Sequence, residues 1–324
     1  MSDLASIIIV THNNWPDLEL AIQSALHQSY RPVEVMVVDN ASTDATPDMV
    51  SRRFGDSVRY LWQSANVLDG GGYNTGFRAA RGEFIQFLDA DDFLAPDKIE
   101  KQIEAFRADP DVDIVRGQFR QFQRSTGGAR WSDVDVAEYD DLLTRLIASD
   151  GVGSGAGLVI HNILFRRRAL EAIGPWDEEI VGADLDMFLR AAWAGLRFRY
   201  CPESLCFYQV RPGQMSADRP THLRNREKTW AKALEYVTAE PHRSAIARKL
   251  ARLRFYVAIS PSISTRRERL EKLREAYHTH SATVSVPVLL IGWLLASAPG
   301  ARALLNPPLL HAFRSRMASA LDLK

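Results

Sequence analysis

The stretch from Glu83 to Leu94 constrains the fold of this chain most strongly. It reads Glu-Phe-Ile-Gln-Phe-Leu-Asp-Ala-Asp-Asp-Phe-Leu, an apolar run that leads into Asp89, Asp91 and Asp92. Such an apolar strand is typical of a sheet buried on both faces, and its carboxylates then lie at the C-terminal edge, where open α/β sheets bind ligands. Three acids at one strand end repel one another. A divalent cation such as Mg²⁺ or Mn²⁺ offsets this repulsion. The alternative is a capping turn, in which Asp92 or Asp97 opens the next helix.

Strands and helices alternate along the first hundred residues. Four apolar runs predict strands, at 6–10, 33–38, 58–62 and 84–88. Helical signals follow the first two strands, beginning at Pro16 and at Thr46-Pro47. The glycine-rich segment 70–76 is expected to be a loop that precedes a short basic helix. This alternation predicts an α/β fold with a doubly wound, mostly parallel sheet and helices on both faces.

The pattern beyond residue 97 is less regular. It predicts helices at 97–106, 168–173 and 185–194 and strands at 112–115, 158–165, 198–200 and 204–210. Residues 118–138 are polar and match neither the periodicity of a helix nor that of a strand. From about residue 222 onward the signals are helical and basic, so we expect a separate helical region at 219–324.

Charge is unevenly divided along the chain. Residues 1–218 contain 21 Lys and Arg against 33 Asp and Glu, and residues 219–324 contain 19 against 7, although the whole chain is neutral. The basic part is expected either to meet an anionic surface or ligand or to attract the acidic part. Cys201 and Cys206 are the only cysteines. They lack zinc-ligand spacing and suit a reducing compartment, and the N-terminal residues do not resemble a signal peptide, so we expect a cytoplasmic protein.

Six motifs, in this order along the chain, resemble those of family 2 glycosyltransferases of the GT-A fold. They are Ile-Val-Thr-His-Asn-Asn at 9–14, Val-Val-Asp-Asn-Ala-Ser-Thr-Asp at 37–44, Asn-Thr-Gly at 74–76, Phe-Leu-Asp-Ala-Asp-Asp at 87–92, Ala-Asp-Leu-Asp at 183–186 and Tyr-Gln-Val-Arg-Pro-Gly at 208–213. The resemblance implies a GT-A domain over residues 1–218, with a nucleotide-binding half at about 1–96 and an acceptor half at about 97–218.

The resemblance also implies roles for single residues. Asp39 corresponds to the acid that binds the nucleotide base, Asp89 to the acid near the ribose and metal, and Asp91 to the metal-binding acid. The implied cofactor is Mn²⁺ or Mg²⁺. Asp184 corresponds to the base that deprotonates the acceptor hydroxyl in an inverting displacement. Further nucleotide-sugar-binding positions are Thr11, Asn13, Asn74 and Arg211.

The implied roles agree with the chemistry of a sugar nucleotide. Acids at successive strand ends can bind the base and the ribose diol directly, and the diphosphate through a metal. The leaving diphosphate gains charge as the glycosidic bond breaks, so a bound cation stabilises the transition state.

Three positions depart from the family pattern. Ala183 replaces the Glu that usually precedes the catalytic Asp, and Tyr73 replaces the Arg that often precedes the Asn-x-Gly motif. Arg211 stands where family members often have His. Arg cannot ligate a metal but can hold a phosphate through two hydrogen bonds. These changes leave the reaction class intact and affect the acceptor and diphosphate contacts.

Simpler structural roles remain open for several of these residues. Asp39 fits a strand-end turn, and Asp184 fits a helix cap. Asp186 competes with Asp184 for the role of base but fits better as half of an i, i+4 ion pair on a helix surface. His161 fits a hydrogen-bonded core histidine. Trp176 fits either a packing role or the wall of an acceptor pocket.

Residues 281–301 contain no charged residue and are flanked by basic ones. Pro287, Gly292 and Pro299 interrupt this stretch. Three interpretations stay open: a segment lying on the anionic inner face of the cell membrane, a buried helix, and a true span. Processive synthases of this fold carry a Gln-x-x-Arg-Trp motif and several spans, and this sequence shows neither.

We therefore expect a metal-dependent, inverting enzyme that transfers one sugar at a time. The donor is a nucleotide-sugar, the acceptor is a saccharide or lipid-linked saccharide of a cell-surface glycan, and no nucleic acid is involved. One rival is a non-catalytic sugar-nucleotide-binding scaffold of the same fold, which Ala183 favours. The other is a sugar-1-phosphate nucleotidyltransferase, but that class needs a Gly-Thr-Arg type loop where Thr11-His12-Asn13-Asn14 stands.

Overall fold

The computed structural model describes residues 3–15, 17–125, 128–134, 141–149, 157–211, 219–259, 265–281 and 283–284. They belong to two compact units. The first, called the sheet unit, comprises Met1–Leu143 with Gly151–Gln214, and the second, called the helical unit, comprises Thr144–Asp150 with Met215–Lys324.

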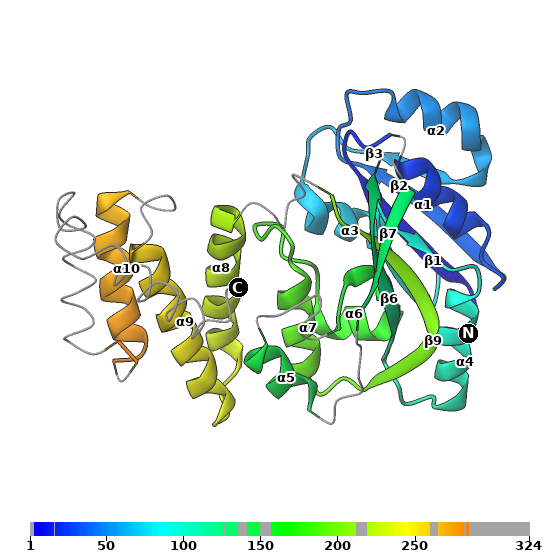
Figure 1. Cartoon of the computed structure of the whole chain (residues 1–324). Helices are drawn as coiled ribbons and strands as arrows, with labels where there is room; N and C mark the ends of the chain where they lie inside the picture. The colour runs from blue at the N-terminus through cyan, green and yellow to red at the C-terminus, as the bar shows by residue number, and fades with distance from the viewer. Residues whose placement is uncertain are drawn as a thin grey trace. The chain divides into compact units, whose positions relative to one another are not determined.

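The sheet unit is built on one mixed sheet (Figure 1). Its strands are β1 (Ala5–Thr11), β2 (Val33–Asp39), β3 (Arg59–Trp62), β4 (Phe84–Asp89), β5 (Phe93–Leu94), β6 (Ile114–Ser125), β7 (Gly128–Asp133), β8 (Ile163–Arg166) and β9 (Phe198–Gln209). Their spatial order is β3-β2-β1-β4-β8-β6-β9-β5, with β7 paired to β6. Strands β3, β2, β1 and β4 run parallel, while β8 is antiparallel to both of its neighbours. The predicted α/β sheet is confirmed.

Helices cover both faces of the parallel strands. The helices of the sheet unit are α1 (Asp17–Leu26), α2 (Thr46–Phe54), α3 (Leu68–Ala79), α4 (Lys98–Ala108), α6 (Arg167–Ile173) and α7 (Asp184–Trp193), while most of α5 (Leu142–Ala148) belongs to the helical unit. Ile7 and Ile9 of β1 belong to the core cluster that includes Leu18 and Ile22 of α1. Ile8 lies against the other face, under α3. Because both faces are covered, every one of these strand residues is buried, which explains the continuous apolar runs.

The glycine-rich segment 70–76 is helical, so the loop prediction was wrong. It forms most of α3, although glycine weakens a helix by about 1 kcal/mol per residue relative to alanine. A Cβ atom on Gly76 would lie 2.2 Å from Ile8 Cγ2, and one on Gly72 would lie 2.6 Å from Val10 Cγ1. The glycines therefore let α3 approach β1 more closely than any side chain allows, and this packing outweighs the low helix propensity.

Two strand predictions need correction, and one segment that the sequence left unassigned is a strand. Residues 118–125, left unassigned, continue β6, which pairs with β7 as an antiparallel hairpin. Residues 198–209 form one strand instead of two, because 202–204 bulge out between residues that still pair with β6. Residues 160–162 form a short 3₁₀ helix, and β8 begins only at Ile163. In the first two cases pairing with a neighbouring strand, which the local pattern does not encode, decides the outcome.

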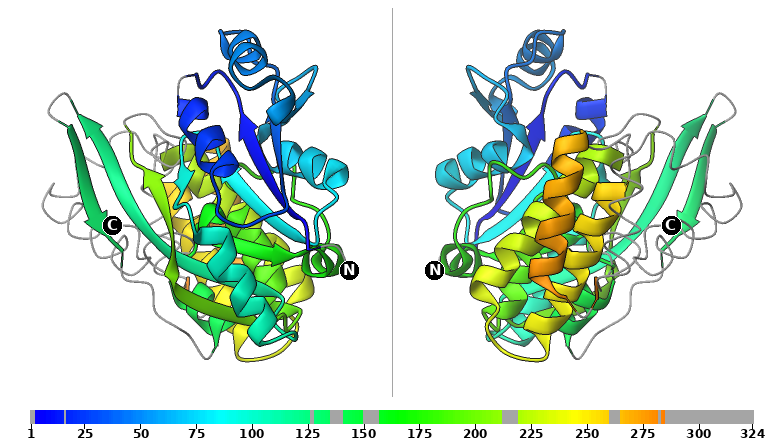
Figure 2. Two further views of the ribbon diagram at one scale, coloured as in Figure 1. Left: turned by 90° about the vertical axis from the view of Figure 1, so that its right-hand side faces the viewer. Right: turned by 90° about the vertical axis from the view of Figure 1, so that its left-hand side faces the viewer.

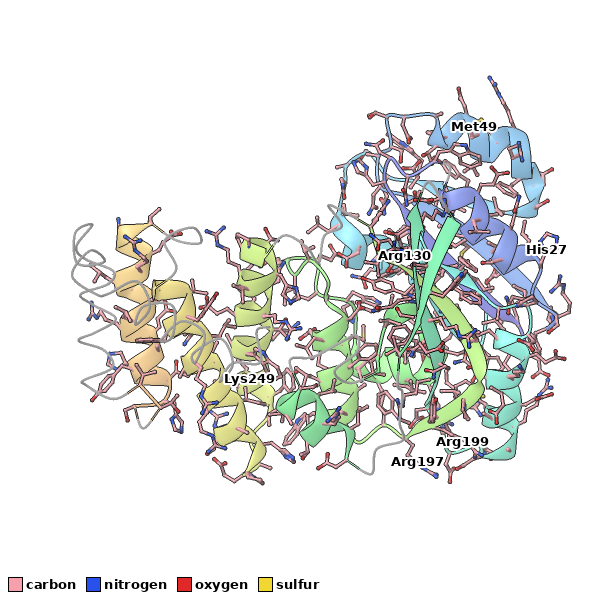
Figure 3. The ribbon with its side chains drawn as sticks, in the orientation of Figure 1. His27, Met49, Arg130, Arg197, Arg199 and Lys249 are labelled. Carbon is pink, nitrogen blue, oxygen red and sulfur yellow. The ribbon has the colours of Figure 1, made fainter. Side chains whose placement is uncertain are left out.

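The helical unit contains α8 (Arg219–Tyr236), α9 (His242–Ile259) and α10 (Arg266–Thr279), as the basic helical pattern predicted. Helix α9 packs against both α8 and α10 (Figure 2). Lys249 on α9, labelled in Figure 3, donates to the carbonyls of Ile147 and Ser149 and lies 5.0 Å from the centre of the Trp230 ring.

In the part of the chain that the structure describes, no helix is both long enough and apolar enough to cross a membrane. Most of the stretch 281–301, for which the sequence left a membrane role open, lies outside the described residues.

Candidate active site

One edge of the sheet collects the acids that the sequence placed at strand ends. Strands β1, β2 and β4 end at Thr11, Asp39 and Asp89. In the parallel register Thr11 lies opposite Asp39, and Val10 lies opposite Asp89. The carboxyl ends of these strands therefore meet at one edge, as expected for ligand binding by an α/β sheet.

Asp39 is fully buried and held in one orientation. Its Oδ1 accepts a hydrogen bond of 2.7 Å from the backbone N–H of Ser42, and its Oδ2 accepts one from the hydroxyl of Tyr60. The Oδ1 atom of Asp39 thus has the strand-end turn role that the sequence left open for this residue. A carboxylate has about four lone-pair sites, so acceptor capacity remains for a further donor.

Asn13 joins the loops that follow β1 and β2. Its backbone has a positive φ of 49°, a conformation that Asn tolerates better than most residues. Its Oδ1 accepts hydrogen bonds from the N–H groups of Thr43, at 2.7 Å, and Asp44, at 3.2 Å. Thr11 lies beneath these loops, and its Oγ1 is buried without a hydrogen bond among the described residues. Both predicted residues therefore lie at the sheet edge.

Asp89 contacts Tyr73 of α3, one of the residues that depart from the family pattern. The hydroxyl of Tyr73 donates to Asp89 Oδ1, and the Tyr73 ring packs 4.8 Å from Phe87 and 5.0 Å from Trp176, measured between ring centres. Burial raises the pKa of Asp89 to about 7, and the charges of neighbouring acids add to this effect. Trp176 is 3% exposed, which favours its packing role.

Asp91 forms an ion pair with Arg211. The Nη2 atom of Arg211 lies 2.9 Å from Asp91 Oδ2, and its Nη1 lies 3.1 Å from Asn14 Oδ1 and 3.5 Å from Asp17 Oδ2. Arg124 also contacts Asp17, at 2.8 Å. Burial raises the pKa of Asp91, and the positive charge of Arg211 opposes that rise.

Asp92 and His161 form a buried pair behind these acids. Asp92 Oδ1 accepts a hydrogen bond of 2.7 Å from the N–H of Gln209, and Asp92 Oδ2 lies 2.9 Å from His161 Nδ1. Burial lowers the pKa of His161 to about 4. The core position of His161 is as predicted, but neither ring nitrogen has a hydrogen bond of good geometry among the described residues. No local pattern in the sequence predicts the contact between His161 and Asp92.

The donor set at this edge suits a hard divalent cation. One ligand atom each from Asp89, Asp92 and His161 lies within 4.8 Å of the other two. Carboxylates combined with a neutral imidazole match the ligands that Mn²⁺ accepts. Burial, and next the charges of the neighbouring acids, raise the pKa values of Asp89 and Asp92, and a bound cation would oppose both effects.

Asp184 is the first residue of α7. The N-cap is Ala183, which makes no side-chain hydrogen bond, so Asp184 does not take the N-cap position that the simpler interpretation gave it. Burial raises the pKa of Asp184 well above its ordinary value, and the nearby charges of Asp89 and Asp69 raise it further. A carboxylate whose pKa is raised is a stronger proton acceptor.

Two residues of α3 position the segment that leads to Asp184. Asp69 Oδ2 accepts a hydrogen bond of 3.0 Å from the N–H of Gly182. Asn74 is 4% exposed; its amide nitrogen donates to the carbonyl of Trp176 at 3.0 Å and to Glu178 Oε1 at 2.8 Å. The sequence predicted Asn74 as a nucleotide-sugar-binding residue and did not predict this positioning contact. It missed Asp69, whose only signal was an acid at the start of the glycine-rich segment.

Asp186 makes the predicted i, i+4 ion pair, with its Oδ2 2.9 Å from Arg190 Nε. The prediction that this pair lies on the helix surface was wrong, since Asp186 is completely buried. Arg190 also donates to the carbonyl of Ile173, so the pair connects α7 with the end of α6. Asp186 therefore has a structural partner inside the protein, whereas Asp184 is partly exposed.

The fold and the acids at the ends of its strands define a protein of the GT-A class. The model of the family described as "Glycosyl transferase family 2" matches residues 6–174. The chain belongs to this family.

Two relatives illustrate the extent of the similarity. A glycosyltransferase of Nostoc sp. (strain PCC 7120) is 30% identical over 63% of this chain and 64% of its own length. The succinoglycan biosynthesis protein ExoO of Rhizobium meliloti (strain 1021) is 31% identical over 65% of this chain and 62% of its own length. The chain thus spans slightly less than two thirds of these relatives.

Two solved structures share the fold. One is residues 1–349 of S. aureus TarS in complex with UDP-GlcNAc, with a TM-score of 0.66, 18% identity and coverage of 100% of this chain and 93% of that chain. The other is the mannosyltransferase PcManGT from Pyrobaculum calidifontis in complex with GDP-Man and Mn²⁺, with a TM-score of 0.57, 21% identity and coverage of 98% and 84%. At these identities the likeness shows the GT-A fold alone.

Proposed function

We propose that this protein is an inverting, metal-dependent glycosyltransferase that moves one sugar from a nucleotide-sugar to a saccharide or lipid-linked saccharide. The observation that carries the proposal is the placement of Asp39, Asp89, Asp91 and Asp184. Asp39 and Asp89 end parallel strands at one sheet edge, Asp91 follows Asp89, and Asp184 lies close enough to Asp89 for the charge of Asp89 to raise the pKa of Asp184.

On this proposal the donor lies along the sheet edge. Asp39 accepts a hydrogen bond from the nucleotide base, in a region that Thr11 and Asn13 help to shape. Asp89 binds near the ribose, and Arg211 holds the diphosphate. Relatives of this fold bind such molecules, since TarS was solved with UDP-GlcNAc and PcManGT with GDP-Man.

Asp91 and Asp89 are the residues that we propose as ligands of Mn²⁺ or Mg²⁺. They are partly exposed, whereas Asp92 and His161 are each 1% exposed, so among these four described residues Asp89 and Asp91 are the more accessible to a diphosphate. A bound ion would neutralise charge on the leaving diphosphate. The presence of Mn²⁺ in the PcManGT complex supports this choice.

Asp184 acts as the general base. The acceptor hydroxyl oxygen attacks the anomeric carbon, the bond from that carbon to the diphosphate oxygen breaks, and the hydroxyl proton passes to Asp184. The buried environment that raises its pKa makes the carboxylate a better proton acceptor at neutral pH. Asn74 and Asp69 act indirectly by fixing the 176–182 segment that precedes the base.

A cell-surface glycan is the acceptor class that we favour, supported by similarity to a protein named for succinoglycan biosynthesis. We propose that the enzyme works in the cytoplasm or at the inner face of the membrane. The two cysteines of the chain are free and buried, which suits a reducing compartment.

The test combines nucleotide binding with turnover. Calorimetric titration of UDP, GDP, dTDP and CDP, each with and without Mn²⁺, should find one nucleotide that binds in a metal-dependent manner, and Asp91→Ala should abolish this binding. Asp184→Asn should keep nucleotide binding but lower donor hydrolysis and transfer by roughly 10²–10⁴-fold. Asp97→Asn, on the partly exposed surface, is the matched control.

Near-wild-type turnover by Asp184→Asn would refute the base assignment. Nucleotide binding by a wild-type protein that neither hydrolyses the donor nor transfers the sugar to any acceptor would favour the scaffold interpretation instead.

A further inference from the structure

We infer that Arg211 and a divalent cation compete for Asp91, so that binding of metal and binding of diphosphate are coupled in this protein. The inference rests on the proposed function, because it takes the acidic edge of the sheet as the donor site. It concerns a property of this chain's own residues, the ion pair between Arg211 and Asp91.

The geometry places the guanidinium across two acidic loops. One terminal nitrogen of Arg211 lies 2.9 Å from Asp91 Oδ2, in the loop after β4. The other terminal nitrogen lies near Asn14, in the loop after β1, and near Asp17, the first residue of α1. Among the described residues its contacts include two carboxylates, those of Asp91 and Asp17, so the guanidinium neutralises part of the charge that a metal ion would otherwise neutralise.

An ion bound to Asp91 would lie beside this guanidinium. A divalent cation sits about 2.0–2.2 Å from a carboxylate oxygen, and Arg211 contacts the same carboxylate at 2.9 Å. Two positive groups at such short range repel strongly, and Arg offers no lone pair with which to ligate the ion. Metal binding at Asp91 therefore requires Arg211 to move away from it.

A diphosphate offers the Arg211 guanidinium an alternative partner to Asp91. A guanidinium binds phosphate oxygens through two parallel hydrogen bonds, which a single carboxylate oxygen does not match. A nucleotide that takes Arg211 leaves Asp91 open for the ion. By linkage, the factor by which the nucleotide tightens metal binding equals the factor by which the metal tightens nucleotide binding.

The expected factor is modest because the pair is not fully buried. The side chain of Arg211 is 39% exposed and that of Asp91 is 19% exposed, so solvent screens part of the attraction. Partly exposed ion pairs correspond to changes of up to about fivefold in a binding constant. We therefore expect roughly a three- to fivefold change when the guanidinium is removed.

The experiment measures Mn²⁺ binding without nucleotide, by electron paramagnetic resonance of the free ion. Arg211→Ala should bind Mn²⁺ roughly three- to fivefold more tightly than the wild-type protein, and Arg211→His at least as tightly as Arg211→Ala, because imidazole can ligate the ion. Arg124→Ala is the matched control: Arg124 pairs with Asp17 at 2.8 Å, and its loss changes the net charge equally without touching Asp91. In the double variant Arg211→Ala/Asp91→Asn the gain should disappear.

Equal Mn²⁺ affinity in the wild-type protein and Arg211→Ala would overturn the inference, and so would an equal gain in Arg124→Ala, which would show a general effect of charge. Absence of Mn²⁺ binding in every variant would overturn it as well. These failures are distinguishable from failure of the proposed function, which is decided separately by nucleotide binding and by metal-dependent turnover of the wild-type protein.

Discussion

Replacing Asp89 with Asn is expected to stabilise the protein in the absence of metal while removing its function. Asp89 stands beside two further carboxylates, Asp91 and Asp92, and burial together with their charges raises its pKa to about 7. Keeping Asp89 ionised therefore costs folding free energy. Asn has nearly the same shape, carries no charge, and keeps an oxygen that can accept the hydrogen bond from Tyr73.

The magnitude follows from the pKa. A rise from 3.8 to about 7 corresponds at about 1.4 kcal/mol per pKa unit to an upper bound of about 4 kcal/mol. The amide nitrogen of Asn needs a partner of its own, which removes about 1–2 kcal/mol of the gain. A net stabilisation of about 2 kcal/mol should raise the melting temperature of a unit of this size by roughly 4–8 °C.

The sign of the pH dependence is fixed by the direction of the shift. A carboxyl whose pKa is higher in the folded than in the unfolded protein binds its proton more tightly when folded, so its ionisation destabilises the fold as pH rises from about 4 to about 7. The advantage of Asp89→Asn should therefore be full at pH 8 and smaller at pH 5. Mn²⁺ should stabilise the wild-type protein more than the variant.

The assay is thermal unfolding followed by tryptophan fluorescence in EDTA at pH 5 and pH 8. Asp111→Asn is the control, because the Asp111 side chain is 83% exposed, and it should change the melting temperature little at either pH. A lower melting temperature for Asp89→Asn at pH 8 would refute the electrostatic argument. An identical increase at pH 5 and pH 8 would refute it too, since the gain would then not come from charge.

Three further substitutions test the positions that shape the site. Gly76→Ala should destabilise the protein by about 2 kcal/mol or more in urea unfolding, because its Cβ would lie 2.2 Å from Ile8 Cγ2; a loss below about 0.5 kcal/mol would show that α3 can move away from β1. Tyr60→Phe should weaken nucleotide binding in calorimetry by roughly tenfold, because it removes the donor that orients Asp39, and unchanged affinity would argue against Asp39 as a base-binding residue. Trp176→Ala should lower the free energy of unfolding by about 3–5 kcal/mol, while a fold as stable as wild type would contradict its packing role.

The sequence alone predicted the parallel part of the sheet and the residues at its edge. Consecutive parallel strands end on the same side, so apolar runs that finish at Thr11, Asp39 and Asp89 place these side chains together without knowledge of any contact. Their position therefore follows from periodicity and topology. The same reasoning could not resolve α3, because glycine-rich composition indicates a loop unless the surface that the glycines pack against is known.

Contacts between segments far apart along the chain also could not be predicted from the sequence. Strand β9 brings Gln209 to Asp92, and the 3₁₀ helix at 160–162 brings His161 to the same carboxylate. These two contacts with Asp92 depend on the pairing of strands that are far apart along the chain, and no local pattern encodes that pairing. Asp69 was missed for the same reason, since its partner Gly182 lies in a loop that only the fold brings near.

Tyr73 and Arg211, the two departures from the family pattern near the acidic cluster, together move one positive charge from one side of the site to the other. Where relatives often carry Arg before the Asn-x-Gly motif, Tyr73 meets Asp89 with a neutral hydroxyl, so the α3 side of the site has lost a positive charge. Where relatives often carry His after the last strand, Arg211 meets Asp91 with a guanidinium, so the β9 side has gained one. The number of positive charges near the acids is thus kept while their place changes. If the two positions compensate, Tyr73→Arg should restore to Arg211→His the nucleotide affinity that Arg211→His loses alone, and a calorimetric double-mutant cycle with no coupling between them would show that they act independently.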